Sequence, residues 1–373
     1  METWNDSKAH TAFIVMKIID WYIFKKFIGT FVYAISLLII VVIIFDISEN
    51  IEDFLKKNAP VNAIIFDYYL NFIPYFINLF IYLFTFISVI FFTSKMAGDT
   101  EIIAILSSGV SFKRMLKPYL LAGILLAVLS LYLGNILIPQ ANVVRREFKN
   151  KYMENLYKDK DRNIHVQIEK GVFVYVENYN NNLNIGYRFT MEKYDGPEMV
   201  YRMVADRIEL DTTGTRWSIY GYAERHIDSL TETFAKGNRL DTALNLLPTD
   251  LYKVKEEFEV MNFWELRRYI SAEKMKGNAG VIYYEVEMHK RMASPAAILI
   301  LTFIGVALSS RKVRGGIGVH LGAGIAITFS YILFMQISTV FATYGNLSPL
   351  LAAWIPNIMF AVIGIYLVMK APK

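Results

Sequence analysis

Apolar residues are gathered in long stretches that contain no Asp, Glu, Lys or Arg. These stretches are residues 27–45, 68–94, 118–144, 292–310 and 315–369. A membrane-spanning helix needs roughly 20 apolar residues, and a soluble core helix rarely has so many without a charge. The last stretch is long enough to cross twice, and a turn signal containing Gly345 and Pro349 divides it. The pattern therefore predicts six transmembrane helices.

Polar residues are concentrated between the third and fourth predicted spans. Four runs there alternate apolar with polar side chains, and clusters of Asn, Asp, Gly and Pro separate them: residues 164–178, 183–194, 199–210 and 216–227. A period of two with such turns predicts an antiparallel sandwich or jelly roll. An amphipathic helix is predicted after Asn262, its N-cap, and another from Val281 that continues into the fourth span. The expected fold class is a helical membrane protein with an all-β domain inserted between three helices and three.

These elements divide the chain into four regions. Residues 1–26 are expected to be a leader, with Met16 as an alternative start, followed by a short interfacial helix or an ordinary aromatic and basic flank. The other regions are spans one to three with their loops (27–144), the β-domain with its connecting helix (145–280), and spans four to six (281–373).

Charge adds an orientation to this division. The net charge is +5, and 54% of residues are hydrophobic although 20% are charged. Lys and Arg are retained in cytoplasmic loops, and the uncompensated ones all flank the spans on one side: Lys17, Lys25, Lys26, Lys95, Lys113, Arg114, Lys117, Arg311, Lys312, Arg314, Lys370 and Lys373. Both termini are therefore predicted to be cytoplasmic and the β-domain to lie outside. The chain has no cysteine, so this domain folds without disulfides. The basic balance follows from the orientation and does not indicate nucleic-acid binding.

The loop between the second and third spans predicts a short amphipathic helix near residues 98–110. Asp99 or Thr100 is its expected cap, and Ser107-Ser108-Gly109 its end. Ile102, Ile105 and Leu106 share one face. Such a helix can be a docking point for a soluble partner, or it can lie flat on the membrane.

Enzyme motifs are not found in the sequence. There is no Walker A sequence or nucleophile elbow, and the five histidines have no metal-ligand spacing. The glycines from Gly315 to Gly324 resemble a phosphate loop superficially, and Gly318 and Gly322 are expected instead to allow close helix packing. The spans have no ionisable groups at their centres, which argues against a proton relay, and Asp46 and Asp67 are expected near the outer ends. Aromatic residues such as Phe31, Phe45, Phe72 and Phe76 suit either acyl chains in a cavity or simple lipid exposure.

Residues 94–116, SKMAGDTEIIAILSSGVSFKRML, resemble the coupling-helix region of the LptF/LptG permease family of lipopolysaccharide export. Within that family, an LptG-like subunit is expected in preference to an LptF-like one. Three further stretches agree in order: residues 18–31, 289–316 and 345–367. The resemblance implies a β-jelly-roll outside the membrane and a lipid cavity shared with a second LptF/LptG-type permease. It implies that lipopolysaccharide passes to an LptC-like periplasmic protein, and that an LptB-like ATPase dimer holding ATP-Mg drives the step. This chain then needs no cofactor and is a multi-pass protein of the Gram-negative inner membrane.

The resemblance also implies two sets of functional residues. The coupling surface would comprise Glu101, Ile102, Ala104, Ile105 and Gly109. Basic residues at the outer membrane edge contact lipid A phosphates in the family, and the first span has none. Arg145 and Arg146, just after the third span, are the nearest candidates, with Phe31, Phe45, Phe72 and Phe76 for the acyl chains.

Two other functions compete with this interpretation. A mechanotransmission ABC permease for lipoproteins or peptides would also use a separate ATPase, but such permeases place their outer domain after the first of four spans. A membrane scaffold without transport would bind no ATPase.

Overall fold

The computed structural model describes residues 17–153, 162–180, 183–211, 216–228, 231–246, 248–251, 257–275, 280–311, 313 and 316–370. It forms two compact units. One comprises Met1–Phe148 and Glu285–Lys373, and the other Lys149–Tyr284. The predicted leader and alternative start at Met16 lie outside the described residues.

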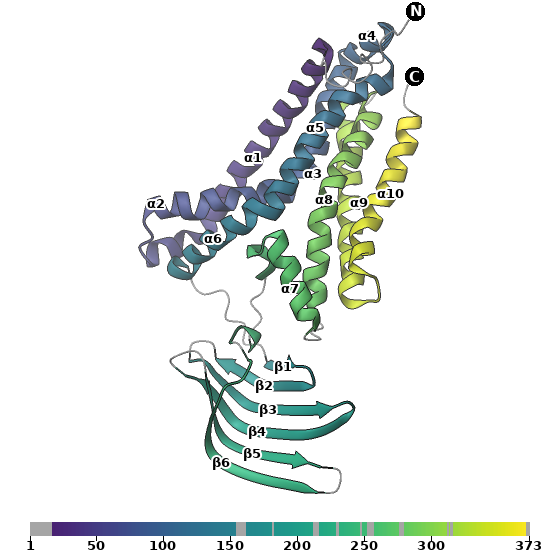
Figure 1. Cartoon of the computed structure of the whole chain (residues 1–373). Helices are drawn as coiled ribbons and strands as arrows, with labels where there is room; N and C mark the ends of the chain where they lie inside the picture. The colour runs from purple at the N-terminus through teal and green to yellow at the C-terminus, as the bar shows by residue number, and fades with distance from the viewer. Residues whose placement is uncertain are drawn as a thin grey trace, which may run out of the picture. The chain divides into compact units, whose positions relative to one another are not determined.

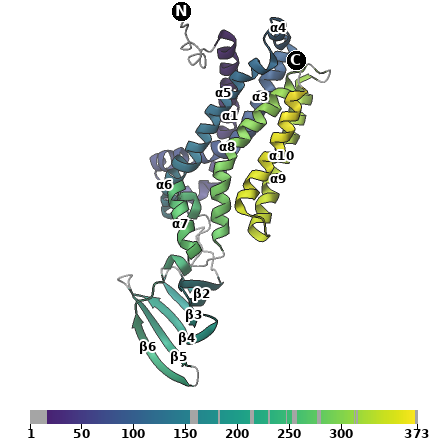
Figure 2. The same cartoon turned by 45° about the vertical axis from the view of Figure 1, so that its right-hand side comes forward.

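Six helices in the described part of the chain are long and apolar enough to cross a membrane. In chain order they are α1 (Ile18–Lys56), the segment Val61–Gly98, the segment Phe112–Tyr152, α8 (Val281–Ser309), α9 (Gly316–Tyr344) and α10 (Pro349–Met369). Figure 1 shows them as a bundle, and α9 and α10 lie side by side in both Figure 1 and Figure 2. The prediction of a helical membrane protein with an inserted β-domain is confirmed.

The first helix is longer than predicted. In the described residues the predicted interfacial region from Ile18 and the first span are one helix, because α1 continues without a break through 39 residues. At 1.5 Å per residue it is ~58 Å long, about twice the hydrocarbon thickness of a bilayer. Its buried residues recur every four positions from Ile23 to Ile39 and form one narrow stripe. The rest of α1 in this region is available to lipid or to another protein.

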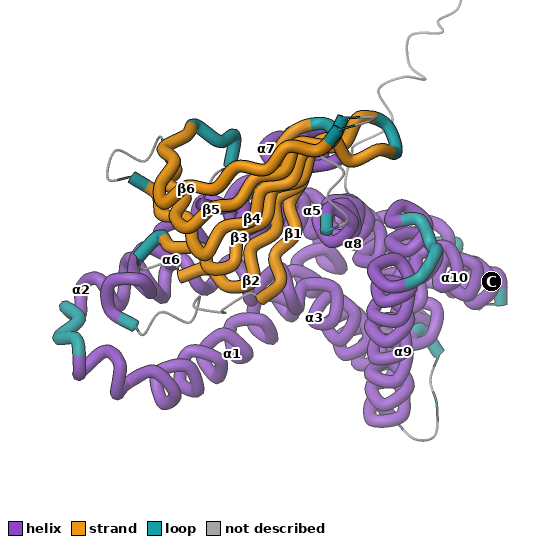
Figure 3. The backbone as a smooth tube through the Cα atoms, turned by 90° about the horizontal axis from the view of Figure 1, so that it is seen from below, coloured by secondary structure: helices purple, strands orange, loops and turns teal. Residues whose placement is uncertain are grey.

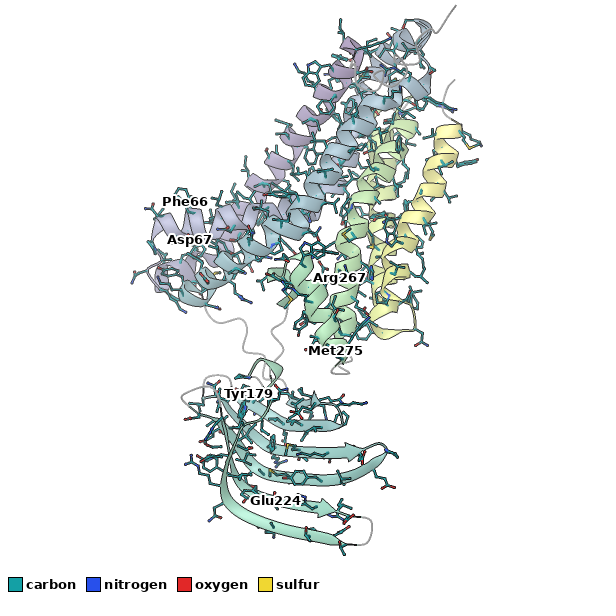
Figure 4. All side chains as sticks on the ribbon, in the orientation of Figure 1. Phe66, Asp67, Tyr179, Glu224, Arg267 and Met275 are labelled. Carbon is teal, nitrogen blue, oxygen red and sulfur yellow. The ribbon has the colours of Figure 1, made fainter. Side chains whose placement is uncertain are left out.

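The second and third spans each contain a π-helical segment that the sequence did not predict. The second consists of α2 (Val61–Ala63), η2 (Ile64–Tyr69) and α3 (Leu70–Gly98). The third consists of α5 (Phe112–Tyr132), η3 (Leu133–Leu137) and α6 (Ile138–Tyr152). π-Helical turns are rare, and those that occur often lie at functional sites. Asp67, expected where water can reach it, is exposed on η2 beside exposed Phe66 (Figure 4).

The fourth span, α8, packs on its neighbours through small residues. A Cβ atom at Gly305 would lie 2.9 Å from Val89, on α3, and one at Gly364 of α10 would lie 3.2 Å from Ile304. The prediction for Gly318 and Gly322 is wrong within this chain, since a Cβ at either would have nothing within 4 Å. These two glycines face open space because the close helix contacts are made elsewhere.

The second unit contains a six-stranded antiparallel sheet in its described residues. The strands are β1 (Arg162–Glu169), β2 (Val172–Asn180), β3 (Ile185–Asp195), β4 (Glu198–Leu210), β5 (Trp217–Ile227) and β6 (Glu232–Thr242). Each pairs with the next, so the order is that of a meander and not the Greek-key order of a complete jelly roll (Figure 3). One face is apolar, and its buried residues include Phe189, Trp217 and Ile219.

Two features of the sheet were not predicted from the alternating pattern. The first predicted run, residues 164–178, is a hairpin of β1 and β2 that turns at Gly171, whose φ is +78°. The pattern missed this turn because a single Gly interrupts an otherwise strand-like run. Strand β6 was not predicted because most of its residues are exposed and polar.

After the sheet come η4 (Pro248–Leu251), η5 (Glu257–Val260) and α7 (Phe263–Met275). The predicted cap is confirmed: Asn262 Oδ1 accepts hydrogen bonds from the backbone of Trp264 and Glu265, and Glu265 accepts one from the backbone of Asn262. Arg267 and Met275 of α7 are labelled in Figure 4. The predicted second helix is the start of α8 and runs into the fourth span as expected.

Candidate functional site

The loop between α3 and α5 folds as the short helix α4 (Glu101–Ser107). Figure 1 places α4 at the end of the helical unit where α10 ends. Ile102 is 1% exposed and belongs to the core that α1, α3 and α5 form, while Ile105 and Leu106 pack against that core. The predicted apolar face is confirmed. Because it is covered by the chain's own helices, it cannot serve to lie flat on a membrane.

The ends of α4 follow the prediction only in part. Thr100 is the N-cap residue, but its side chain makes no capping hydrogen bond. It has a left-handed φ of 62°, and its hydroxyl donates to the carbonyl of Asp99 instead. The predicted position of the cap is therefore confirmed, but the expected capping hydrogen bond from the side chain is not formed. At the other end Gly109, with φ +85°, ends the helix as predicted.

Glu101 joins α4 to the beginning of α1. Its carboxylate accepts a hydrogen bond from the Tyr22 hydroxyl at 2.9 Å and forms an ion pair with Lys26 Nζ at 3.3 Å. The Lys26 ammonium also lies 4.3 Å from the centre of the Tyr22 ring. About a third of each charged side chain remains exposed. The residue expected to contact a partner therefore also holds two elements of this chain together.

A second ion pair joins α1 to α5. Arg114 donates from Nη1 and Nη2 to the two carboxylate oxygens of Asp20, at 2.7 Å and 2.5 Å. Asp20 is 6% exposed, and it also accepts the backbone N–H of Lys17 at the start of α1. A two-bond fork of this kind fixes both position and orientation. The sequence did not reveal the pair, which is separated by 94 residues. The signal was a lone acid among the lysines that precede the first span.

The five predicted coupling residues lie in different environments. Ala104 and Gly109 are exposed, Glu101 and Ile105 are half-buried, and Ile102 is buried. The outward surface of α4 consists of Ala104 with Ile103 and Ser107, both also exposed.

The predicted substrate residues gather at α3 and α6 only in part. The Arg145 guanidinium lies 6.0 Å from the ring centre of Phe72 and 5.6 Å from that of Tyr75. Phe76 packs on Phe72 with ring centres 4.3 Å apart, and Arg146 is half-buried on α6.

The remaining phenylalanines are not brought to this group. Phe31 is 3% exposed and belongs to the chain's own core, whereas Phe45 is 72% exposed. Asp46 is hydrogen-bonded to two tyrosines of the second span. Its carboxylate accepts hydrogen bonds from the hydroxyls of Tyr68 and Tyr69, at 3.2 Å and 3.0 Å.

Comparison with known proteins decides the family. The family model described as lipopolysaccharide export system permease LptF/LptG matches residues 21–370, which include the sheet, five complete spans and all of α1 except its first three residues. The chain belongs to the LptF/LptG family.

A relative of this LptF/LptG permease is the lipopolysaccharide export system permease protein LptG of Escherichia coli (strain K12). It is 21% identical over 294 residues, which are 74% of this chain and 77% of that protein. The family includes both LptF and LptG. The expectation that this chain is LptG-like and not LptF-like stays a prediction.

Membership also bears on catalysis and location. An LptF/LptG permease is a multi-pass inner-membrane subunit that is not catalytic by itself. Across the described ranges, no group of His, Asp and Glu is placed to hold a metal ion. The candidate site is formed by α4 and the beginning of α1.

Proposed function

We propose that this permease extracts lipopolysaccharide from the inner membrane and is driven by a separate LptB-like ATPase dimer that docks on α4. A second LptF/LptG-type permease completes the lipid cavity, and an LptC-like protein receives the lipid outside. ATP and Mg²⁺ are bound by the ATPase, so this chain needs no cofactor of its own.

One observation carries the proposal: α4 is a short, well-anchored helix with an exposed outer surface. Ile102 fixes it to the bundle, Glu101 ties it to α1, and Ala104 and Ser107 face outward. A rigid helix that is packed on three spans can pass the movement of a bound partner to those spans. In the proposed orientation α4 lies in the cytoplasm, where ATP is available.

Docking is tested by Ala104→Arg, which adds a long charged side chain to the outer surface of α4. The purified complex is expected to lose its ATPase while the chain itself stays folded, because Ala104 is exposed. Val61→Arg is the matched control, since Val61 is also exposed and belongs to α2, far from α4 in Figure 1. Retention of the ATPase by the Ala104→Arg complex would contradict docking on α4.

Orientation is tested by adding single cysteines to a chain that has none. Asn238→Cys on β6 and Ser107→Cys on α4 are both at exposed positions. A membrane-impermeant maleimide applied to cells with a permeabilised outer membrane is expected to label Asn238→Cys and to spare Ser107→Cys. The reverse pattern would invert the proposed topology.

A further inference from the structure

The beginning of α1 is attached to the α4 region at two points. Asp20 and Arg114 join α1 to the first turn of α5, and Lys26 and Glu101 join it to α4. These two ion pairs lie on either side of Ile23, which is fully buried in the core shared with Ile102. Two charged attachments with an apolar contact between them resist both sliding and rotation of the helix.

The middle of α1 is packed less closely on the rest of the helical unit, although Asp46 accepts hydrogen bonds from Tyr68 and Tyr69 and Phe54 is buried near the other end of the helix. In its most apolar 18-residue stretch, 22% of the residues are buried, the smallest fraction among the six candidate spans. Between residues 40 and 53 none of its residues is buried. A long helix that is ion-paired at its beginning and sparsely packed through its middle can transmit a displacement of its beginning to its exposed middle.

We propose that Asp20 and Arg114 are positioning residues that make α1 follow α4. Displacement of α4 by the docked ATPase then displaces α1, whose exposed side is available to the lipid substrate or to the second permease. The inference rests on the proposed function and adds to it the route by which movement leaves α4.

The chemistry of the pair supports this role. Asp20 is nearly inaccessible to water, and Arg114, whose side chain is 29% exposed, donates to both of its oxygens. A two-bond fork fixes the relative geometry of two helices better than a Lys–carboxylate contact does. Lys26 and Glu101, each a third exposed, add a second and weaker attachment.

The test measures lipopolysaccharide released to a soluble acceptor per ATP hydrolysed, in the reconstituted complex. Asp20→Asn keeps an acceptor for the Lys17 N–H but removes the charge, and Arg114→Lys keeps the charge but removes the fork. Each is expected to lower the ratio roughly tenfold, within the range of coupling changes seen for such contacts, while ATPase content stays at the wild-type level. Lys113→Gln, an exposed neighbour on α5, is the control and is expected to leave the ratio unchanged.

An unchanged ratio in both variants, at wild-type ATPase content, overturns the proposal and leaves the proposed function intact. Absence of an ATPase from the wild-type complex overturns the proposed function, and this inference falls with it.

A second measurement keeps Asp20 and Arg114 unaltered. It applies if neither the Asp20→Asn nor the Arg114→Lys complex assembles. Spin labels at Ile18→Cys and Ser107→Cys, both exposed, report the distance between the first residue of α1 and the last residue of α4. The distance is expected to be the same without nucleotide and with trapped ATP. A changed distance overturns the proposal.

Discussion

The hydroxyl of Tyr331 donates to Asn357 Oδ1 at 2.9 Å, in the buried contact between α9 and α10. The other end of the same amide, Nδ2, donates to the carbonyl of Ala293 on α8, also at 2.9 Å. One side chain thus connects three spans. Both its partners are buried, so neither can turn to water when the amide is removed.

Asn357→Leu is expected to destabilise the helical unit by about 0.5–2 kcal/mol, because it removes both interhelical hydrogen bonds and leaves the buried Tyr331 hydroxyl without its acceptor. Thermal unfolding of the purified complex in detergent measures the change. Tyr331→Phe removes only one of the two bonds and should cost less. A larger loss for Tyr331→Phe than for Asn357→Leu would show that ring packing, and not the amide, holds these helices.

Gly305 and Gly318 differ in what surrounds them, and alanine should distinguish them. At Gly305 a methyl group would lie 2.9 Å from Val89 and 3.1 Å from the Phe86 ring, so Gly305→Ala is expected to cost about 1–3 kcal/mol. At Gly318 a methyl group meets nothing in this chain, and Gly318→Ala should be neutral or stabilise α9 slightly. Thermal unfolding of the isolated chain checks both. Loss of stability at Gly318 alone would contradict the open surroundings found there.

Arg145 and Arg146 keep their predicted role in phosphate binding as a proposal. Arg145→Ala with Arg146→Ala is expected to slow extraction of lipopolysaccharide from proteoliposomes roughly tenfold or more, because hydrogen bonds from a guanidinium to a phosphate are charge-assisted. Lys113→Ala, a loss of positive charge on α5 near α4, controls for net charge. If the double variant extracts lipopolysaccharide at the control rate, the phosphates are recognised elsewhere.

The β-domain offers a prediction about pH. Hydrogen bonds from the Ser218 hydroxyl, at 2.6 Å, and from Arg239 lower the pKa of Asp241 from its ordinary value of 3.8. A carboxyl with a lowered folded-state pKa stabilises the fold above its unfolded pKa, and this contribution is lost as the pH falls through the folded pKa.

Ser218→Ala removes the main cause of that shift. Its melting temperature is therefore expected to lie farthest below that of the wild type near about pH 6, and the difference should shrink toward about pH 3. A difference that stays constant over this range would assign the effect of Ser218 to packing.

The sequence by itself determined the number of spans, the inserted sheet and the family. Charge-free stretches of about 20 residues have few alternatives to a membrane helix, and alternation in β2 to β5 follows directly from the pleat. The Asn262 cap and the apolar face of α4 were also readable, because both depend on residues close together in the chain.

Contacts between distant segments were decided only by the tertiary structure. Asp20 meets Arg114, and Glu101 meets Lys26, across 94 and 75 residues, and no local pattern records such a pairing. The glycines show the same limit: Gly305 is packed and Gly318 is open although both lie in apolar helices. Local pattern fixes which face of a helix is apolar, but only the packed bundle determines what that face meets.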